Sequence, residues 1–212
     1  MAVRLVWVTP EAQEQIVYCA RVSNPKSQSE GRDPERLIRY LIKPKPWSPF
    51  QMANMCVEVN TTRDIAAQII RHSSFAFQEF SQRYADVSSL GGYGPFELRY
   101  QDAKNRQNSI HDEGGSLSIQ FSDRISDLLE ASQALYDDML EASVAKECAR
   151  KVLCLQAPSR IYMNGTIRSW VHYLQARVSP DTQKEHRDIA KEIAVLLREQ
   201  CPDVVAACDL PA

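Results

Sequence analysis

The sequence predicts a single α+β domain over residues 1–212, with a small, mostly antiparallel sheet flanked by helices and a helix-rich C-terminal half. Two observations favour this class. Short β-branched and apolar runs alternate with helical patterns in the first half, and long helical periodicity begins at Phe121. A length of 212 residues suits one domain, and no repeat or linker interrupts the chain.

Strand and helix patterns alternate near the N-terminus. Residues 3–8 are β-branched and apolar, as in a buried strand, and residues 11–22 have helical spacing. Residues 24–34 have the composition of a loop. Asp33 before Pro34 is typical of a helix N-terminus, so we expect a short helix that ends in the KPKP tetrapeptide.

A second strand and helix lead into a polar segment. Residues 52–60 indicate a strand and residues 62–72 a helix. In residues 73–84 the phenylalanines alternate poorly with polar side chains, so a helix end that continues into a structured loop fits better than an amphipathic strand. Residues 85–100 predict a loop and then a strand, and the polar residues 101–117 predict a mobile loop.

The second half is dominated by helical periodicity. Seven residues with spacings of four and three form the a/d seam of a long helix: Phe121, Ile125, Leu128, Ser132, Leu135, Met139 and Ala142. Such a seam suits packing on a neighbouring subunit, and a core helix explains it equally well. Residues 159–163 predict a short strand, residues 166–176 a helix, and Asp181 the cap of a last helix.

Composition and charge narrow the possible partners. The chain is 44% hydrophobic and 25% charged, with a net charge of -2, which argues against disorder and against a basic nucleic-acid surface. The six cysteines form no CxxC pair, so we expect buried thiols in a reducing compartment and no metal site. The N-terminus has neither a signal peptide nor a membrane span, which predicts a cytoplasmic protein without a membrane partner.

The densest polar stretch is RHSSFAFQEFSQRY, at residues 71–84. Arginine side chains and the backbone N–H groups of a structured loop are typical phosphate ligands. A solvated turn with an internal Glu79–Arg83 ion pair is an equally good interpretation of the pattern alone. Further cations follow at Arg150, Arg160, Arg168, His172 and Arg177. No GxGxxG, P-loop, GxSxG or HExxH motif occurs, and Cys154 has no neighbouring base to activate it.

At residues 71–84 the sequence resembles the flavin-dependent thymidylate synthases. The family signature is RHR, seven residues and then serine, and here RHS is followed after seven residues by Ser81. The flanking segments agree as well: WSPFQM at 47–52, TTRDIAAQIIRH at 61–72 and NGTIRSWVHYLQARVSPDTQKEHRDIA at 164–190. The resemblance therefore covers nearly the whole chain in order.

The resemblance implies reductive methylation of dUMP to dTMP. In such enzymes FAD is bound non-covalently, methylenetetrahydrofolate donates the carbon and NADPH is the reductant. The resemblance also implies a homotetramer whose active sites lie at subunit interfaces. No enzyme nucleophile attacks the pyrimidine in this family, which agrees with the absence of an activated cysteine.

Residue roles are implied by matching positions. The residues that would surround dUMP are Gln68, Arg71, Glu79, Ser81, Gln82, Arg83, Arg150 and Arg177. Arg177 and Ser81 would be the catalytic pair: the guanidinium lies at the uracil N3/O4 edge, where it stabilises developing enolate-like charge, and the serine helps to hold the nucleotide. The matching flavin contacts are Ser48, Arg71, His72, Ser73, Glu79, Thr166, Arg168 and His172.

Several positions depart from the family pattern. Ser73 stands where arginine is usual, Gln51 where glutamate is common, Pro46 where histidine is common, and His172 where asparagine is frequent. Loss of one charge-assisted hydrogen bond costs about 1.5–3 kcal/mol, so we expect weaker flavin binding. Two alternatives follow: a related pyrimidine nucleotide C5 methylase or hydroxymethylase acting on UMP or dCMP, and a catalytically impaired nucleotide-binding homologue.

Overall fold

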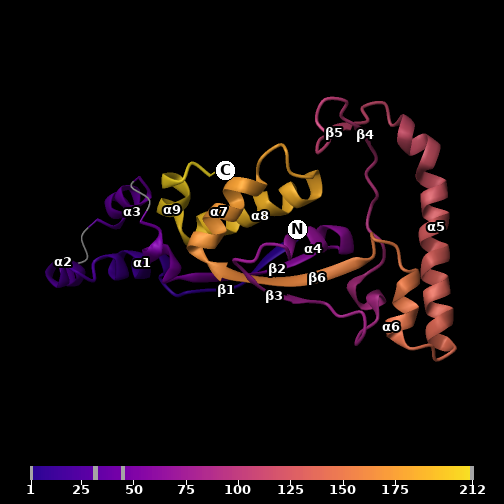
Figure 1. Cartoon of the computed structure of the whole chain (residues 1–212), viewed down its shortest axis with the longest axis horizontal. Helices are drawn as coiled ribbons and strands as arrows, with labels where there is room; N and C mark the ends of the chain where they lie inside the picture. The colour runs from indigo at the N-terminus through magenta and orange to yellow at the C-terminus, as the bar shows by residue number, and fades with distance from the viewer. Residues whose placement is uncertain (1, 31–32, 44–45, 211–212) are drawn as a thin grey trace. The chain divides into compact units, whose positions relative to one another are not determined.

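The computed structural model describes residues 2–30, 33–43 and 46–210 (Figure 1). It has an α+β architecture, as predicted, with a four-stranded sheet in the order β1-β2-β6-β3 and a separate pair of strands, β4-β5. Strands β1 and β2 pair antiparallel, and so do β4 and β5. Among the described residues no helix is long and apolar enough to cross a membrane.

The elements follow one another along the chain with these bounds. The N-terminal part contains β1 (Val3–Val8), α1 (Ala12–Ala20), α2 (Pro25–Glu30), α3 (Pro34–Ile42), η1 (Ser48–Gln51), β2 (Asn54–Thr62), α4 (Arg63–Ile69) and β3 (Ala76–Glu79). The middle contains η2 (Val87–Leu90), β4 (Arg99–Gln101), β5 (Ser109–His111), α5 (Ser116–Glu141), α6 (Lys146–Ala149) and η3 (Arg150–Val152). The C-terminal part contains β6 (Pro158–Thr166), α7 (Ile167–Arg177), α8 (Lys184–Gln200) and α9 (Pro202–Ala207).

The described residues group into two compact units. The first unit comprises Met1–Val59, Ile70–Gln78 and Tyr162–Ala212, and the second comprises Asn60–Ile69 and Glu79–Ile161. Three of the four boundaries fall inside β2, β3 and β6, and the fourth lies at the end of α4. The single-domain organisation stays a prediction, and each unit is described by itself below.

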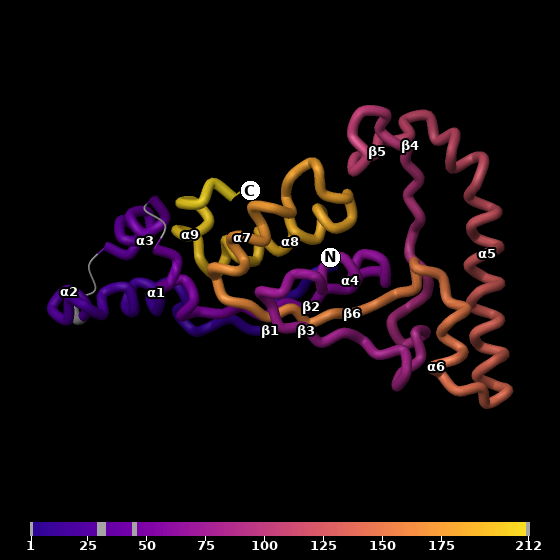
Figure 2. Tube along the Cα trace, in the orientation of Figure 1, coloured from indigo at the N-terminus to yellow at the C-terminus, as the bar shows by residue number. Residues whose placement is uncertain are grey.

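The core of the first unit lies where α7 packs on α8 and α8 packs on β1 (Figure 2). Trp170 of α7 is completely buried, and its indole N–H donates to the Met55 carbonyl of β2 at 3.0 Å. The ring of Phe75 meets Trp170 edge-on at 4.6 Å. Burial of each such side chain stabilises the fold by about 1.5–3 kcal/mol, so α7 is firmly anchored on the sheet.

The second unit has a smaller core. Val87, Tyr136 and Ala149 are buried, and six partly buried apolar residues pack around them: Phe80, Met139, Leu140, Val144, Val152 and Leu153. The 26-residue helix α5 runs without interruption, and α6 and η3 pack against it (Figure 2). Gly115 is the N-cap of α5, and the Asp112 carboxylate accepts from the Leu117 N–H of the first turn at 2.7 Å.

The predicted start of the third helix is confirmed, and the predicted loop just before it is wrong in part. Asp33 caps α3, since its side chain accepts from the Arg36 N–H at 3.1 Å, with Pro34 as the first helical residue. Residues 24–34 contain helix α2 in addition to loop. Asn24 accepts from the Ser27 N–H at 3.2 Å, so the Asn-Pro pair begins a helix here. Residues 31–32, and residues 44–45 of the KPKP stop, lie outside the described part of the chain.

The polar segment 73–84 contains a strand, contrary to the sequence prediction. In β3, Ala76 and Gln78 are exposed whereas Phe77 and Glu79 are half-buried, so burial alternates as in any edge strand. The residue types hide this alternation, because an alanine faces solvent and a carboxylate faces inward. Pairing along β6 continues past the strand, where the Phe80 N–H donates to the Arg160 carbonyl at 2.8 Å.

The predicted seam of α5 does not serve as a core face along its whole length, because two of its leucines are exposed and Ala142 is exposed after the end of the helix; its packing on a neighbouring subunit stays a prediction. Leu128 is 62% exposed and Leu135 is 49% exposed, whereas Ser132 and Tyr136 are the buried residues of the helix. The face toward the second unit's core therefore shares Ser132 and Met139 with the predicted seam but does not include its leucines. The leucines form a separate apolar stripe that the described residues leave uncovered.

Smaller corrections concern loops and helix ends. Residues 101–117, predicted as a mobile loop, include the second strand of the β4–β5 hairpin. The last long helix begins at Lys184, so Asp181 does not cap it. Instead the buried Thr182 ties the preceding turn to α7 by donating to the Ala176 carbonyl at 3.3 Å. Helix α9, with Pro202 in its first turn, was not predicted.

Candidate functional site

A guanidinium–imidazole pair occupies the C-terminal end of α7. Arg177 is the last residue of the helix, and its Nε–H donates to Nε2 of His72 at 3.0 Å. Because arginine can only donate, the His72 Nε2 atom must be the acceptor, which places the imidazole proton on Nδ1. Burial, helped by the positive charges of Arg177 and Arg71, lowers the pKa of His72. The imidazole is therefore neutral and stays a hydrogen-bond acceptor at neutral pH.

Two further polar side chains lie in the interior next to this pair. The Tyr173 hydroxyl of α7 and Nε2 of His186 on α8 are 3.0 Å apart, and both residues are buried. The Tyr173 ring meets the His72 ring edge-on at 4.9 Å. Burial first, and then the positive charge of Arg177, lower the pKa of His186 to about 4. Burial also raises the pKa of Tyr173, so both groups are uncharged at neutral pH.

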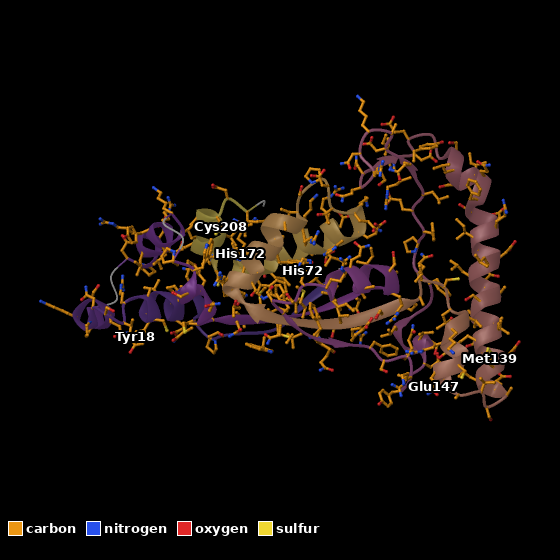
Figure 3. The ribbon with its side chains drawn as sticks, in the orientation of Figure 1. Tyr18, His72, Met139, Glu147, His172 and Cys208 are labelled. Carbon is orange, nitrogen blue, oxygen red and sulfur yellow. The ribbon has the colours of Figure 1, made fainter. Side chains whose placement is uncertain are left out.

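The other imidazole of the first unit lies on a different face of α7. His172, which is labelled in Figure 3, meets the Trp47 ring edge-on at 4.7 Å, and Trp47 in turn packs on Phe50 of η1. Burial and the nearby charge of Arg168 lower the pKa of His172. The helix begins at Thr166, whose hydroxyl accepts from the Ser169 N–H at 3.1 Å. α7 therefore carries a capped N-terminus, two cations and a neutral imidazole.

The serines of the predicted flavin set lie in short connections. Ser48 is the first residue of η1, and both Ser48 and Ser73 are exposed. Arg71, also exposed, precedes His72 in the segment between α4 and β3. The first unit thus holds seven members of the predicted flavin set: Ser48, Arg71, His72, Ser73, Thr166, Arg168 and His172. Of the predicted nucleotide set it holds Arg71 and Arg177.

Glu79 is an ion-pair partner inside the second unit. Its carboxylate accepts from Arg63 of α4 at 2.7 Å and from the Ser159 hydroxyl at 3.2 Å. The alternative Glu79–Arg83 ion pair is therefore wrong. Arg83 instead approaches Glu147 of α6 at 3.8 Å, and both of these side chains are more than half exposed (Figure 3 labels Glu147). Such a pair contributes little to stability, so a stronger anion can displace the glutamate from Arg83.

Gln82 lies beside Ser81 and Arg83 and is 5% exposed. Its amide nitrogen is buried and has no hydrogen-bond partner among the described residues. A buried unpaired donor costs about 1–3 kcal/mol, so this amide suits a bound acceptor. The Ser81 carbonyl closes a turn by accepting from the Tyr84 N–H at 3.0 Å. The second unit also carries Gln68 on α4 and Arg150 at the start of η3, both half-buried.

Sequence reasoning missed four residues of these clusters: Trp47, Arg63, Tyr173 and His186. His186 lies one turn before Ile189 on the apolar face of α8, and this spacing was the available signal. A histidine on a buried helix face requires a hydrogen-bond partner, and that partner can come only from another element.

Comparisons with known proteins agree with this geometry. The family model "Thymidylate synthase complementing protein" matches residues 4–203. A probable flavin-dependent thymidylate synthase of Paramecium bursaria Chlorella virus 1 is 44% identical over 198 residues, covering 93% of this chain and 91% of the relative. The flavin-dependent thymidylate synthase of Synechocystis sp. is 43% identical over 194 residues, covering 92% of this chain and 88% of the relative.

A similar fold is found among solved structures. The UMP/dUMP methylase PolB from Streptomyces cacaoi, bound with 5-Br dUMP, superposes with a TM-score of 0.84 at 24% identity. The match covers 97% of this chain and 93% of that chain. At 24% identity this likeness shows the fold alone, whereas the relatives with 43–44% identity show the family. This chain belongs to the flavin-dependent thymidylate synthase family.

Proposed function

We propose that this protein converts dUMP to dTMP by reductive methylation, with methylenetetrahydrofolate as carbon donor, FAD as redox cofactor and NADPH as reductant. The observation that carries the proposal is the Arg177–His72 hydrogen bond of 3.0 Å, in a chain 44% identical to a probable flavin-dependent thymidylate synthase. The bond uses Nε of Arg177 and leaves its two terminal nitrogens to donate to a substrate. A guanidinium fixed at the uracil N3/O4 edge stabilises the enolate-like charge that develops when C5 becomes nucleophilic.

Each unit carries members of the proposed nucleotide set. Arg71 and Arg83 are exposed cations suited to a phosphate, as charge-assisted donors. The unpaired Gln82 amide supports a neutral hydrogen bond to the nucleotide, and Ser81 lies next to it. Gln68, Glu79 and Arg150 complete the proposed set, with Glu79 orienting Arg63 through their ion pair.

The donors of the first unit fit a flavin dinucleotide. Arg71 and Arg168 supply charge for the phosphates, His72 carries its proton on Nδ1, and His172 is a neutral imidazole beside Trp47. Thr166 places the N-terminus of an 11-residue helix among them, and Ser48 and Ser73 add exposed hydroxyls. Bound FAD would supply the electron transfer that links NADPH to the transferred carbon.

The assembly proposed for this enzyme is a homotetramer with active sites at subunit interfaces. The uncovered leucines of α5 support it, because an exposed apolar stripe on a long helix is typical of a contact surface. The proposed compartment is the cytoplasm, where reducing conditions suit six cysteines with unpaired thiols.

Tritium release tests the reaction. Purified protein saturated with FAD receives dUMP tritiated at C5, together with NADPH and methylenetetrahydrofolate. We expect tritium in the solvent and dTMP as the product detected by mass spectrometry. A panel of dUMP, UMP and dCMP then separates this activity from a methylase or hydroxymethylase of different substrate. Binding of dUMP without release of tritium at saturating FAD would contradict the proposal and support the catalytically impaired homologue.

A further inference from the structure

A polar chain crosses the apolar interior between α7 and α8 and ends at Arg177. It begins at His186, which is 2% exposed and shares a 3.0 Å hydrogen bond with the Tyr173 hydroxyl. Tyr173 lies four residues before Arg177, on the same face of α7. Its ring packs edge-on against His72 at 4.9 Å, and His72 accepts the hydrogen bond of Arg177.

The direction of the Arg177–His72 hydrogen bond makes this arrangement specific. The Arg177 Nε–H needs an acceptor, so His72 must present a lone pair at Nε2 and keep its ring in one plane. The Tyr173 ring is the surface against which His72 rests, and the bond from the Tyr173 hydroxyl to His186 fixes that ring. Neutral aromatic rings thus determine the orientation of the guanidinium.

We infer that Tyr173 and His186 are positioning residues for Arg177, which they orient through His72. The inference rests on the proposed function, in which Arg177 faces the uracil ring. A guanidinium has two terminal nitrogens in a fixed plane, so a small rotation moves both donors away from the N3/O4 edge. Misplacement by about 1 Å can cost roughly 100-fold in rate, which gives the buried chain its catalytic importance.

The test uses three variants of the FAD-loaded enzyme. Tyr173→Phe and His186→Leu keep the volume and remove the hydrogen bond, and we expect kcat to fall about 10- to 100-fold in each. His186→Gln keeps a side-chain amide that can donate to or accept from the tyrosine hydroxyl, so we expect it to retain most of the rate. Because the two residues act through one bond, the double variant Tyr173→Phe/His186→Leu should lose no more rate than either single variant.

A destabilised core alone does not produce this pattern. Ile193→Ala removes a completely buried side chain two turns after His186 on the same helix, and it should lower Tm as much as His186→Leu while kcat stays unchanged. Equal loss of kcat in Ile193→Ala would overturn the positioning role, and so would a wild-type kcat in His186→Leu. If wild-type enzyme released no tritium from dUMP, the proposed function would fail.

A second readout does not depend on turnover. The nitrogen-15 NMR signals of His72 should show the Nδ1–H form in wild type and in His186→Gln. In His186→Leu they should show a mixture of the Nδ1–H and Nε2–H forms. The reason is that the Tyr173 ring then no longer fixes the His72 ring with Nε2 as the acceptor of the Arg177 bond. An unchanged His72 signal in His186→Leu would mean that His186 does not influence the Arg177–His72 bond, and it would overturn the inference.

Discussion

Buried imidazoles tie the stability of the first unit to pH. The folded-state pKa of His186 is about 4, below its ordinary value of 6.5, so the unfolded chain binds this proton first as pH falls. Stability is therefore full above pH 6.5 and decreases between pH 6.5 and 4. A difference of this size corresponds to roughly 3 kcal/mol at the acid end.

Urea unfolding at pH 8, 6.5, 5 and 4 measures this loss. In the His186→Leu variant the contribution of this group should vanish, and the remaining decrease with acid should be smaller than in wild type. An identical pH dependence in the two proteins would show that another group causes the acid loss. His72 adds in the same direction, because its pKa is lowered by burial and by the two arginines.

Gly165 is the one glycine of the described residues at which an added Cβ atom would meet a neighbour within 4 Å. A Cβ atom added there would lie 2.6 Å from Cε1 of Phe75 and even closer to Cδ1 of the same ring. Phe75 cannot move away easily, since it is packed against Trp170 and Tyr173. We expect Gly165→Ala to lower the free energy of unfolding by about 1–3 kcal/mol.

Urea denaturation checks this prediction, with Gly92→Ala as the matched control. A Cβ atom at Gly92 meets nothing within 4 Å, so the control should leave the unfolding midpoint nearly unchanged. If both variants unfolded at the same urea concentration, the close approach of Phe75 to Gly165 would be refuted.

Ser73 is the departure from the family pattern with the clearest consequence for the cofactor. The side chain is exposed and follows His72 directly, so an arginine fits there without repacking. One regained charge-assisted hydrogen bond is worth about 1.5–3 kcal/mol, equivalent to about 10- to 150-fold in affinity. Calorimetry with FAD should show this increase in Ser73→Arg. Equal affinities would mean that residue 73 does not contact the flavin.

The exposed leucines of α5 predict that this helix contributes to the contact between subunits. Leu128 and Leu135 are exposed and lie seven residues apart, so they recur on one side of the helix. The double variant Leu128→Glu/Leu135→Glu should give a species of lower mass in light scattering, while its circular dichroism stays that of the wild type. The pair Ser122→Glu/Gln133→Glu on the same helix is the polar control, and it should keep the wild-type mass.

Elements were predictable from sequence where residue type and burial agree. Asp33 and Pro34 mark the start of α3 unambiguously, because their local hydrogen bonds determine the helix. In β3, an outward alanine and an inward glutamate obscure the alternation, and the reason lies in another element: Glu79 faces Arg63 of α4. On α5, two apolar stripes share one periodicity, so spacing alone could not tell which one covers the core.

For the candidate site, the resemblance proposed positions and the structure supplied their surroundings. The match to the family pattern suggested Arg177 as a nucleotide ligand and His72 as a flavin ligand, and the hydrogen bond between them is consistent with a shared site. The partners Tyr173 and His186 required three-dimensional information, since a histidine at helical spacing with apolar residues is indistinguishable from a core residue. The roles at dUMP and FAD stay predictions that the experiments above test.

At the scale of the whole molecule, the proposed nucleotide residues divide between the two units. Arg177 lies in the first unit and Arg83 in the second. If each active site forms at a subunit interface, the two arginines of one site can come from different protomers. Arg177→Ala and Arg83→Ala should then each be inactive alone, because every site of either protein lacks one guanidinium.

Mixing the two inactive proteins tests whether Arg177 and Arg83 of one active site come from different protomers. After exchange of subunits, some interfaces would combine the intact Arg177 of one protomer with the intact Arg83 of its partner, and tritium release should return to a sizeable fraction of the wild-type rate. Two batches of the same variant mixed together are the control and should stay inactive. If light scattering and mass tags demonstrated exchange but no activity returned, each site would take both arginines from one chain, and the division of Arg177 and Arg83 between protomers would be refuted.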